Sequence, residues 1–545
     1  MRHTLRLHDG GSYRSKFEST ALASGFTPPS YASKGALPPI SGITEIDDQP
    51  AREYSLAELL DGGRFFGCDD VTFKHIALDA HHCGVGELVL CRIGQDDPNQ
   101  VIAAAMAGGA AGILTEQLLP CPLPQCIVGS VDRAMASLAS AQNNRPDRKL
   151  LTIGVLGASG KTSTCLMLSA MTTASGLRTA YQCDLGSHEG VVASTPSTPP
   201  PTGSLLVDWL GEAVDCGSRV AVIELDETAA RHGEYDSIEF DVLLVTQRDT
   251  GDGDFGPSAL HATIDRLASS GVVIVNETDR KSQRFLEQQA VHCVTYGTTQ
   301  SADYAAMPVN QGGGMSTLML AADETRAMME TPLCGPAMAR NLAAASAVGA
   351  LLGYTPETIA QRLGRLRVIP GRGQRMVEFA KPTAVIETGG AVDRLRASLV
   401  AAKEAGVGGR VWCVYAIDGS SDASTLASSG NALERNAHHT VLTTVPEQQE
   451  KFLQNAHQIL DGVKECASMR LVGDQNKAIE WAMEHAGPRD SVVIVLNTRN
   501  TSASQQRGLI EQVESTVQAC WEQREELAEE STDEVPAKIS LKLFP

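Results

Sequence analysis

Short runs of Val, Ile and Leu recur along the middle and C-terminal parts of the chain. They read LLTIGVLG, VAVIEL, DVLLVTQ and GVVIVN in the middle part, and PTAVIE, RVWCVYA, HHTVLTT and DSVVIVLN further on. Helical or polar segments such as NKAIEWAMEHA separate the runs. Apolar strands at crossover distances predict parallel sheets that are covered by helices on both faces. The pattern therefore indicates an α/β protein.

A smaller α/β pattern precedes these runs. GELVLCRIG reads as a strand, QVIAAAMAGGAAGILT as a helix followed by a strand, and VDRAMASLASAQ as another helix. The polar stretch NNRPDRK then ends the helix and marks a linker. The predicted parts of the chain are a leader at residues 1–44, an N-terminal α/β domain at 45–149, a central domain at 150–367, a Rossmann-like C-terminal domain at 368–520 and a charged tail at 521–545.

The leader mixes Ser, Gly, Pro and Tyr without apolar periodicity, and it has no continuous apolar segment of the kind that secretory signals carry. A segment of this composition is predicted to be disordered. Its Arg2, Arg6 and Arg14 leave a transit function open as an alternative.

Composition limits the partners. The net charge of -20 and pI of about 5.1 argue against sequence-independent binding of nucleic acid, which needs a basic surface. No stretch approaches the roughly 18 consecutive apolar residues that span a bilayer. The 13 Cys are scattered without a CxxC pair, as in a reducing cytosol. We expect a soluble cytoplasmic monomer that neither binds nucleic acid nor inserts into a membrane.

The segment GVLGASGKTS at residues 154–163 carries the clearest chemistry, because it lies between an apolar run and a helical stretch. Its glycines allow backbone N–H groups to approach an anion, and the helix N-terminus adds its dipole. Lys161 can reach terminal phosphates, and Thr162 offers a hydroxyl to magnesium. The general GxxxxGK[ST] pattern is not met, since its first glycine falls on Val155. The alternative is a tight turn with a chance lysine.

The loop's glycines recur every third residue, and this spacing resembles the G-x-x-G-x-x-G-K-T-[ST] loop of Mur ligases. Further landmarks agree in order over residues 54–507, most closely with the tripeptide-synthetase (MurE-type) branch. The resemblance implies a three-domain Mur ligase architecture, with a central P-loop parallel sheet and a Rossmann-like C-terminal domain, and ATP and Mg²⁺ as cofactors. The implied nucleotide contacts in the loop are Gly157, Ala158, Ser159, Gly160, Lys161, Thr162 and Ser163.

Three more segments extend the implied nucleotide and metal site. VAVIELDETA is similar to a strand that ends in E-V-S-S-H, whose Glu binds magnesium. This resemblance makes Glu224 a metal ligand beside Thr162, and makes Lys161 and Glu224 the catalytic pair. NLAAASAVGALLG and IPGRGQRM are similar to family segments that imply nucleotide contacts from Asn341 and Arg372. The alternatives are ordinary local roles: Glu224 or Asn341 as a helix cap, and Arg372 in a turn.

Two segments resemble the family's substrate contacts. DAHHCGVGELVLCRIG looks like the segment that contacts the uridine nucleotide, with Asp79 retained but Ala80 and His81 in place of Ser and Arg. STPSTPPP is similar to a T-T-P segment that follows the phosphate loop, with Thr198 and Pro199 as the matching residues. The resemblance therefore implies a UDP-linked muramoyl peptide as one substrate and an amino acid as the other.

Other family motifs are degenerate. The His of E-V-S-S-H falls on Thr228, and the lysine that many members carbamylate falls near Ile264, where this chain has none. Gln247 and Thr250 stand for the Asn and His of T-N-x-x-x-D-H-L-D. In the C-terminal part, Asp418 remains from G-G-D-R-D-x-x-K-R without its basic residues, and D-N-P-R is absent.

Two classes of function stay open. The first is an ATP-dependent ligase that joins an amino acid of the diaminopimelate or lysine class to a UDP-N-acetylmuramoyl dipeptide through an acyl phosphate, in the peptidoglycan synthesis on which cell shape and division depend. The second is a non-catalytic or repurposed paralogue that binds nucleotide or a UDP-sugar peptide. A P-loop kinase or GTPase leaves the N-terminal block and the P-G-R hinge unexplained.

Overall fold

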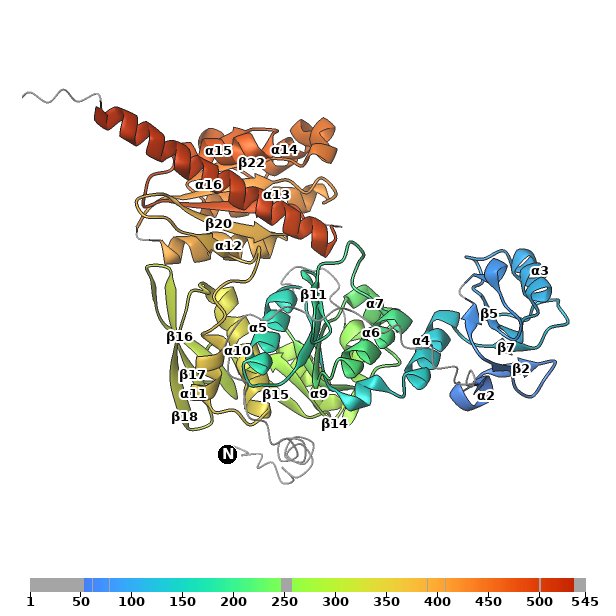
Figure 1. Ribbon diagram of the computed structural model, residues 1–545. Coiled ribbons are helices and arrows are strands. Elements are labelled where there is room, and N and C mark those ends of the chain that lie inside the picture. Colours follow the sequence, from blue (N-terminus) through green and yellow to red (C-terminus); the bar gives the residue numbers. More distant parts are fainter. Residues whose placement is uncertain are drawn as a thin grey trace, which may run out of the picture. The chain divides into compact units, whose positions relative to one another are not determined.

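The computed structural model describes residues 53–60, 62–77, 79–246, 257–389, 391–406, 408–498 and 501–533. Its three larger sheets follow one another along the chain (Figure 1). The predicted leader, including Arg2, Arg6 and Arg14, lies outside the described residues, as do Gln247 and Thr250. Within the described residues, every helix is too short or too polar to cross a membrane.

The N-terminal part forms a five-stranded sheet in the order β2-β7-β6-β5-β4, in which only β2 runs antiparallel to its neighbour. Its core contains Leu88, Leu114 and Leu138. The elements are β1 (Tyr54–Ser55), α2 (Leu56–Leu59), β2 (Arg64–Phe66), β3 (Thr72–Phe73), β4 (Ile76–Ala77), η1 (Ala80–His82), β5 (Leu88–Cys91), α3 (Pro98–Gly108), β6 (Gly112–Thr115), β7 (Gln125–Ile127) and α4 (Val131–Gln142).

The central sheet has eleven strands in the order β11-β10-β9-β12-β8-β13-β14-β15-β16-β17-β18. Its elements are η2 (Pro146–Lys149), β8 (Leu151–Leu156), α5 (Lys161–Thr173), β9 (Thr179–Cys183), β10 (Gly186–His188), β11 (Ala193–Ser194), α6 (Gly203–Asp215), β12 (Val220–Glu224), α7 (Glu227–Arg231), β13 (Phe240–Val245), α8 (Pro257–Ile264), β14 (Leu267–Asn276), α9 (Arg280–Gln288), β15 (Cys293–Gly297), β16 (Tyr304–Gly312), β17 (Met315–Ala322), β18 (Thr325–Thr331), α10 (Pro336–Leu351) and α11 (Pro356–Leu363).

Strands β9, β12, β8, β13, β14 and β15 pair in parallel, as the apolar runs predict. Helices α6 to α9 pack on one face of this sheet, while α5, α10 and α11 pack against one another. The antiparallel strands β16, β17 and β18 extend the sheet beyond the predicted elements. In β17 the buried Ser316, Leu318 and Leu320 alternate with more exposed positions, unlike a strand that is buried on both faces.

The C-terminal sheet has the order β19-β20-β24-β21-β22-β23 and is parallel except at β19. Helices α12, α13 and α14 pack on one face, and α15 and α16 on the other. The elements are β19 (Gln374–Met376), β20 (Thr383–Thr388), α12 (Val392–Ala405), β21 (Val411–Ala416), α13 (Ala423–Asn436), β22 (His439–Thr443), η3 (Pro446–Lys451), α14 (Phe452–Leu460), η4 (Cys466–Ser468), β23 (Met469–Leu471), α15 (Gln475–His485), β24 (Ser491–Leu496) and α16 (Ala503–Asp533).

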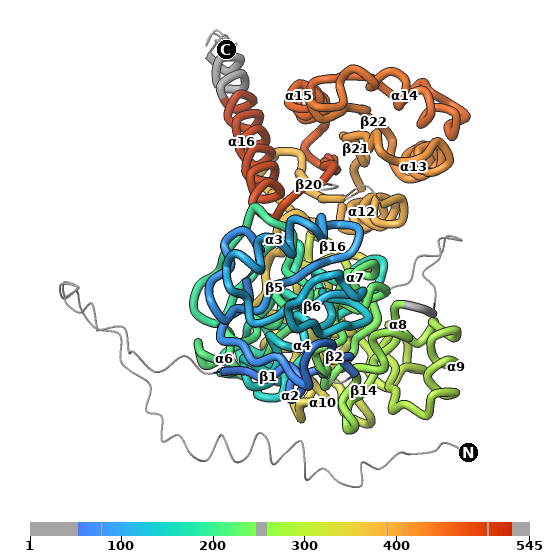
Figure 2. The backbone as a smooth tube through the Cα atoms, turned by 90° about the vertical axis from the view of Figure 1, so that its right-hand side faces the viewer, coloured from blue at the N-terminus to red at the C-terminus, as the bar shows by residue number. Residues whose placement is uncertain are grey.

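The boundary predicted between residues 520 and 521 falls inside α16, which Figure 2 shows as one continuous helix beside β20. Trp521 is only 4% exposed and its indole N–H donates to the carbonyl of Pro382 at 3.3 Å. Arg524, one turn further on, donates to the carbonyls of Met483 and Ala486. The charged sequence of this segment did not predict that the turn is docked, because the burial of the turn depends on a single tryptophan.

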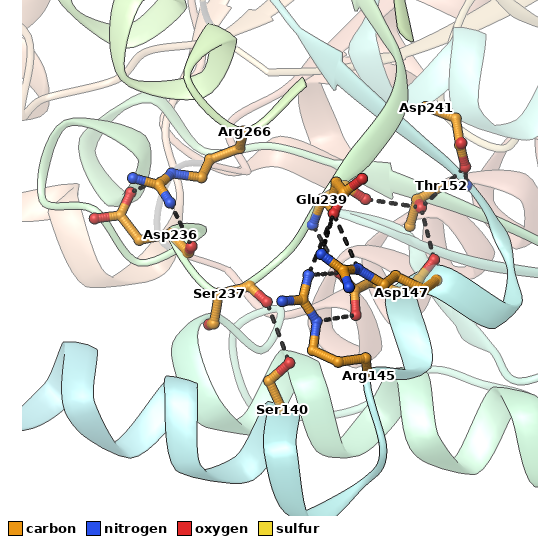
Figure 3. Close-up of polar contacts among 10 residues, drawn as sticks. Ser140, Arg145, Asp147, Thr152, Asp236, Ser237, Glu239, Asp241 and Arg266 are labelled. Atoms are coloured by element: carbon orange, nitrogen blue, oxygen red, sulfur yellow. Dashed lines mark hydrogen bonds and ion pairs between the residues drawn. The ribbon is translucent and has the colours of Figure 1, made fainter. Parts of the chain in front are cut away.

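A polar network joins the linker η2 to the central sheet (Figure 3). Asp147 is 2% exposed; it accepts from Arg145 Nη2 at 2.6 Å and from the backbone N–H of Glu239 at 2.9 Å. Thr152 on β8 donates to the carbonyl of Asp147 at 3.2 Å, and its N–H donates to Asp241 at 3.0 Å. The network thus holds the start of β8 against β13.

We expect Asp147→Ala to lower the free energy of unfolding by about 2–3 kcal/mol, because it leaves buried donors without a partner; the partial exposure of Arg145 limits the loss. Arg148→Ala is the matched control, since Arg148 binds Glu239 at 3.0 Å from an exposed position and should contribute less than about 1 kcal/mol. Urea unfolding followed by circular dichroism measures both. Equal losses in the two variants would contradict a buried role for Asp147.

Candidate functional site

The turn between β8 and α5 is closely surrounded. Gly157 has φ of 139° and Gly160 has φ of 89°, values that side chains with a Cβ rarely adopt. A Cβ at Gly157 would collide with the side chain of Thr246, and one at Gly160 would collide with that of Asn341. Both positions therefore require glycine, which explains the glycine spacing that departs from the general phosphate-loop pattern.

Helix α5 begins at Lys161 with Gly160 as its N-cap, and no side chain caps its first N–H groups. The first N–H groups of a helix have no partner within the helix, and they carry its positive end. A strand–glycine turn–helix arrangement of this kind is suited to bind an anion. Residues 157–163 therefore form a strand–turn–helix junction of the kind that can bind an anion.

Glu224 at the end of β12 faces the start of α5. Its Oε1 accepts from Thr162 Oγ1 at 3.2 Å, and its Oε2 accepts from the N–H of Asp184 at 3.1 Å. Strand β12 pairs in parallel with β8, with Glu224 beside Val155, so both end at the same edge of the sheet. A carboxylate and a hydroxyl are oxygen donors of the type that Mg²⁺ prefers. In the described residues, no group of three or more His, Cys, Asp and Glu is placed to hold a metal ion.

The surroundings of Glu224 oppose its ionisation. Burial raises the pKa of its carboxyl group, and the neighbouring Asp184 raises it further. Lys161 and the hydrogen bonds from Asp184 and Thr162 act in the opposite direction. A cation bound beside Glu224 would remove most of this penalty, because it supplies the missing positive charge.

The alternative local roles of two site residues are excluded. Helix α7, which follows Glu224, is capped by Asp226, whose side chain accepts from the N–H of Ala229 at 2.9 Å. Helix α10 has Gly335 as its N-cap, so Asn341 lies inside the helix and does not cap it. Both side chains instead face the start of α5.

One pocket is lined by six of the predicted nucleotide residues, but not by Gly157, Ala158 or Lys161. Ser159, Gly160, Thr162 and Ser163 of the loop line it with Asn341 and Arg372. The C-terminal part contributes Glu387 and Arg394 to the same pocket, and α10 contributes Arg340. Sequence reasoning missed Arg394 and Arg340, and also Asp184 at the end of β9. The available signal for Asp184 was its position directly after a buried parallel strand.

The predicted substrate residues lie elsewhere. Asp79 is exposed and caps η1, with its carboxylate accepting from the N–H of His81 at 2.9 Å and bonded to His82 at 2.8 Å. Thr198 and Pro199 are exposed between β11 and α6. None of the three lines the pocket beside the phosphate loop. Their role as substrate contacts stays a prediction.

The structure also places the degenerate motifs. Thr228, which stands for the family's His, lies in α7. Helix α8 ends at Ile264 and contains no lysine. Asp418 is buried after β21 and accepts hydrogen bonds from the side chains of Ser420 and Ser421. The acidic position therefore has a local structural role in this chain.

Comparisons with known proteins agree with this geometry. Residues 155–349 match the family model of the Mur ligase middle domain. The chain is 28% identical over 437 residues to the UDP-N-acetylmuramoyl-L-alanyl-D-glutamate--2,6-diaminopimelate ligase of Thermosynechococcus vestitus, covering 77% of this chain and 87% of that protein. A solved ligase of the same name is 18% identical with a TM-score of 0.59, covering 82% of this chain and 95% of that one. MurF ligase from Thermotoga maritima, in complex with ADP, is 17% identical with a TM-score of 0.57, covering 83% and 98%.

Fold and loop together define a multidomain α/β protein with a phosphate-binding turn in its central sheet. Residues 155–349 match the Mur ligase middle domain, and the chain as a whole is similar to Mur ligases in sequence and fold. The predicted resemblance and the predicted three-domain Mur ligase architecture are thereby confirmed.

We expect Glu224→Gln to change the pH dependence of stability. The folded pKa of Glu224 is raised above the ordinary value of 4.5, so stability is lost as pH rises from that value through the folded pKa. The variant lacks this loss. Without nucleotide and Mg²⁺, the melting temperature of the variant relative to that of the wild type should therefore increase as the pH rises from about 4 to about 8. Glu212→Gln, at an exposed position on α6, is the control, and a difference that is constant with pH would contradict the assignment.

Proposed function

We propose that this chain is an ATP-dependent ligase. It joins an amino acid of the diaminopimelate or lysine class to a UDP-N-acetylmuramoyl dipeptide in peptidoglycan precursor synthesis. The observation that carries the proposal is the pairing of a phosphate-binding turn with the Thr162–Glu224 contact at 3.2 Å. The similarity to ligases of this name, which covers 77% of the chain, supports the substrate class.

In the proposed reaction the terminal phosphoryl group of ATP moves to the substrate carboxylate, giving ADP and an acyl phosphate. The amine of the amino acid then attacks the acyl carbon, forms the amide and expels phosphate while the amine loses a proton. Such transfers depend on positioning and on stabilising negative charge. The N–H groups at the start of α5 and the ammonium of Lys161 would hold the phosphates, and Thr162 and Glu224 would hold Mg²⁺, which neutralises phosphate charge when bound.

The proposal extends to the partners and the setting. Asp79 would contact the uridine nucleotide, and Thr198 and Pro199 the peptide substrate. The net charge of -20 supports a protein that does not bind nucleic acid. We place the reaction in the cytoplasm, carried out by a monomer.

A second candidate function is that of a non-catalytic or repurposed relative that binds nucleotide or a UDP-sugar peptide. Two observations favour it: Thr228 replaces a histidine of the family, and α8 has no lysine. The basic C-terminal segments are also degenerate. The two candidates differ in turnover, because both predict binding of nucleotide.

We expect Lys161→Ala to lower turnover by about 100-fold or more, since it removes a cation aimed at the transferred phosphoryl group. The assay contains ATP, Mg²⁺, the UDP-muramoyl dipeptide and diaminopimelate or lysine, and follows phosphate release and product mass. Lys149→Ala, which removes an exposed lysine of η2, should leave turnover unchanged. Nucleotide binding without turnover for any amino acid would favour the non-catalytic candidate.

A further inference from the structure

Three charged residues meet where the C-terminal part begins. Glu387 is 5% exposed, and its Oε2 accepts from the N–H of Gly373 at 2.9 Å and from Ser398 Oγ at 2.7 Å. Arg372 and Arg394 both act electrostatically on Glu387. All three side chains line the pocket beside the phosphate loop. We refer to Arg372, Glu387 and Arg394 as the arginine–glutamate cluster.

Arg372 has an unsatisfied hydrogen-bond donor in this cluster. Arg372 is 6% exposed, and its Nε has no hydrogen-bond partner, although Nη1 donates to the carbonyl of Gly371 at 3.3 Å. Burial and the like charge of Arg394 lower the pKa of Arg372 to about 10. The carboxylates of Asp184 and Glu224 also act electrostatically on Arg372, but its Nε stays without an acceptor, and a buried unpaired donor is costly. This unpaired donor, in a pocket that Arg394 also lines, indicates that an anion completes the cluster.

The backbone is shaped around Arg394. Its Nη1 donates to the carbonyl of Thr388 at 2.8 Å, at the end of β20. Gly389 has φ of 96°, and a Cβ at this position would collide with the guanidinium of Arg394. The side chain is half-buried in the second position after the start of α12. Arg394 is therefore held at the pocket by contacts at its guanidinium end, unlike a solvated arginine on a helix surface.

We propose that Arg394 is a further phosphate-binding residue of this pocket, and that Glu387 is a positioning residue that holds Arg394 beside Arg372. This inference rests on the proposed function, because it takes a nucleoside triphosphate as the ligand. It assigns to Arg394 a role that the degenerate basic segments of the C-terminal part no longer fill.

The chemistry favours the terminal phosphate as the anion. The pocket reaches Ser159, Gly160, Thr162 and Ser163, which surround the lysine that contacts terminal phosphates in loops of this kind. A guanidinium binds phosphate oxygens through two parallel N–H groups. Two guanidinium groups in the pocket that the phosphate loop lines would therefore favour ATP over ADP. Binding of a substrate carboxylate is the competing source of negative charge, and it would not discriminate between the two nucleotides.

The test compares the affinities for a non-hydrolysable ATP analogue and for ADP, each with Mg²⁺, by calorimetric titration of the full chain. Loss of a charge-assisted hydrogen bond changes affinity by about tenfold or more. We expect Arg394→Ala to lower the affinity for the ATP analogue by about tenfold or more and the affinity for ADP by less than about threefold. Arg394→Lys should recover part of the preference for the ATP analogue over ADP. Lysine restores the positive charge but not the two parallel N–H donors of the guanidinium.

Arg396→Ala is the matched control. Arg396 lies on the same helix, is exposed, pairs with Asp393 at 3.2 Å, and does not line the pocket. We expect it to bind both nucleotides as the wild type does. Glu387→Gln should reduce the preference for the ATP analogue over ADP. If Glu387 had a purely structural role, the substitution would lower the affinity for both nucleotides equally. Melting temperatures of all variants identify any that do not fold, and Arg394→Lys then carries the comparison.

Equal affinities of Arg394→Ala and Arg396→Ala for the ATP analogue would overturn the inference. A wild-type protein that does not prefer the ATP analogue would overturn it too, as would loss of substrate binding alone in Arg394→Ala. The proposed function fails separately, when the wild type binds nucleotide with the expected discrimination but forms no amide.

Discussion

The close packing of the turn between β8 and α5 is the constraint on which the site depends. Gly157 lies against Thr246 and Gly160 against Asn341, so neither position has room for a Cβ. This contact fixes where α5 begins relative to β13 and α10. With the helix start fixed, Thr162 meets Glu224 across the edge of the sheet at 3.2 Å. A preorganised arrangement of this kind costs no reorganisation when a phosphate binds.

Local charges at the site run against the charge of the whole chain. The protein carries a net charge of -20, yet Arg340, Arg372 and Arg394 line the pocket beside the phosphate loop. Field strength in a buried site depends on nearby groups, because solvent screens distant ones. Glu224 and Glu387 are both buried, and burial raises the pKa of each carboxyl group. A cation beside Glu224 and an anion beside the arginines would therefore stabilise these charges.

The structure shows what surrounds two charged residues of the C-terminal part, Asp418 and Arg394. Asp418, the remaining residue of a degenerate segment, accepts hydrogen bonds from Ser420 and Ser421. Arg394 lies on α12 and lines the same pocket as the phosphate loop. Residues that share a pocket can thus come from segments that comparison of motifs along the chain does not bring together.

Apolar patterning by itself determined the parallel strands of the central and C-terminal sheets, because a strand buried on both faces must be apolar throughout. Glycine spacing and the GKT triplet likewise determined the phosphate-binding turn. The sequence did not reveal β16, β17 and β18, nor the docking of Trp521, which is 4% exposed. Only the tertiary structure brought Asp184, Arg340 and Arg394 to the site, since they lie far apart in the sequence. Local pattern decides which segments are buried, whereas the meeting of distant charges depends on how those segments pack.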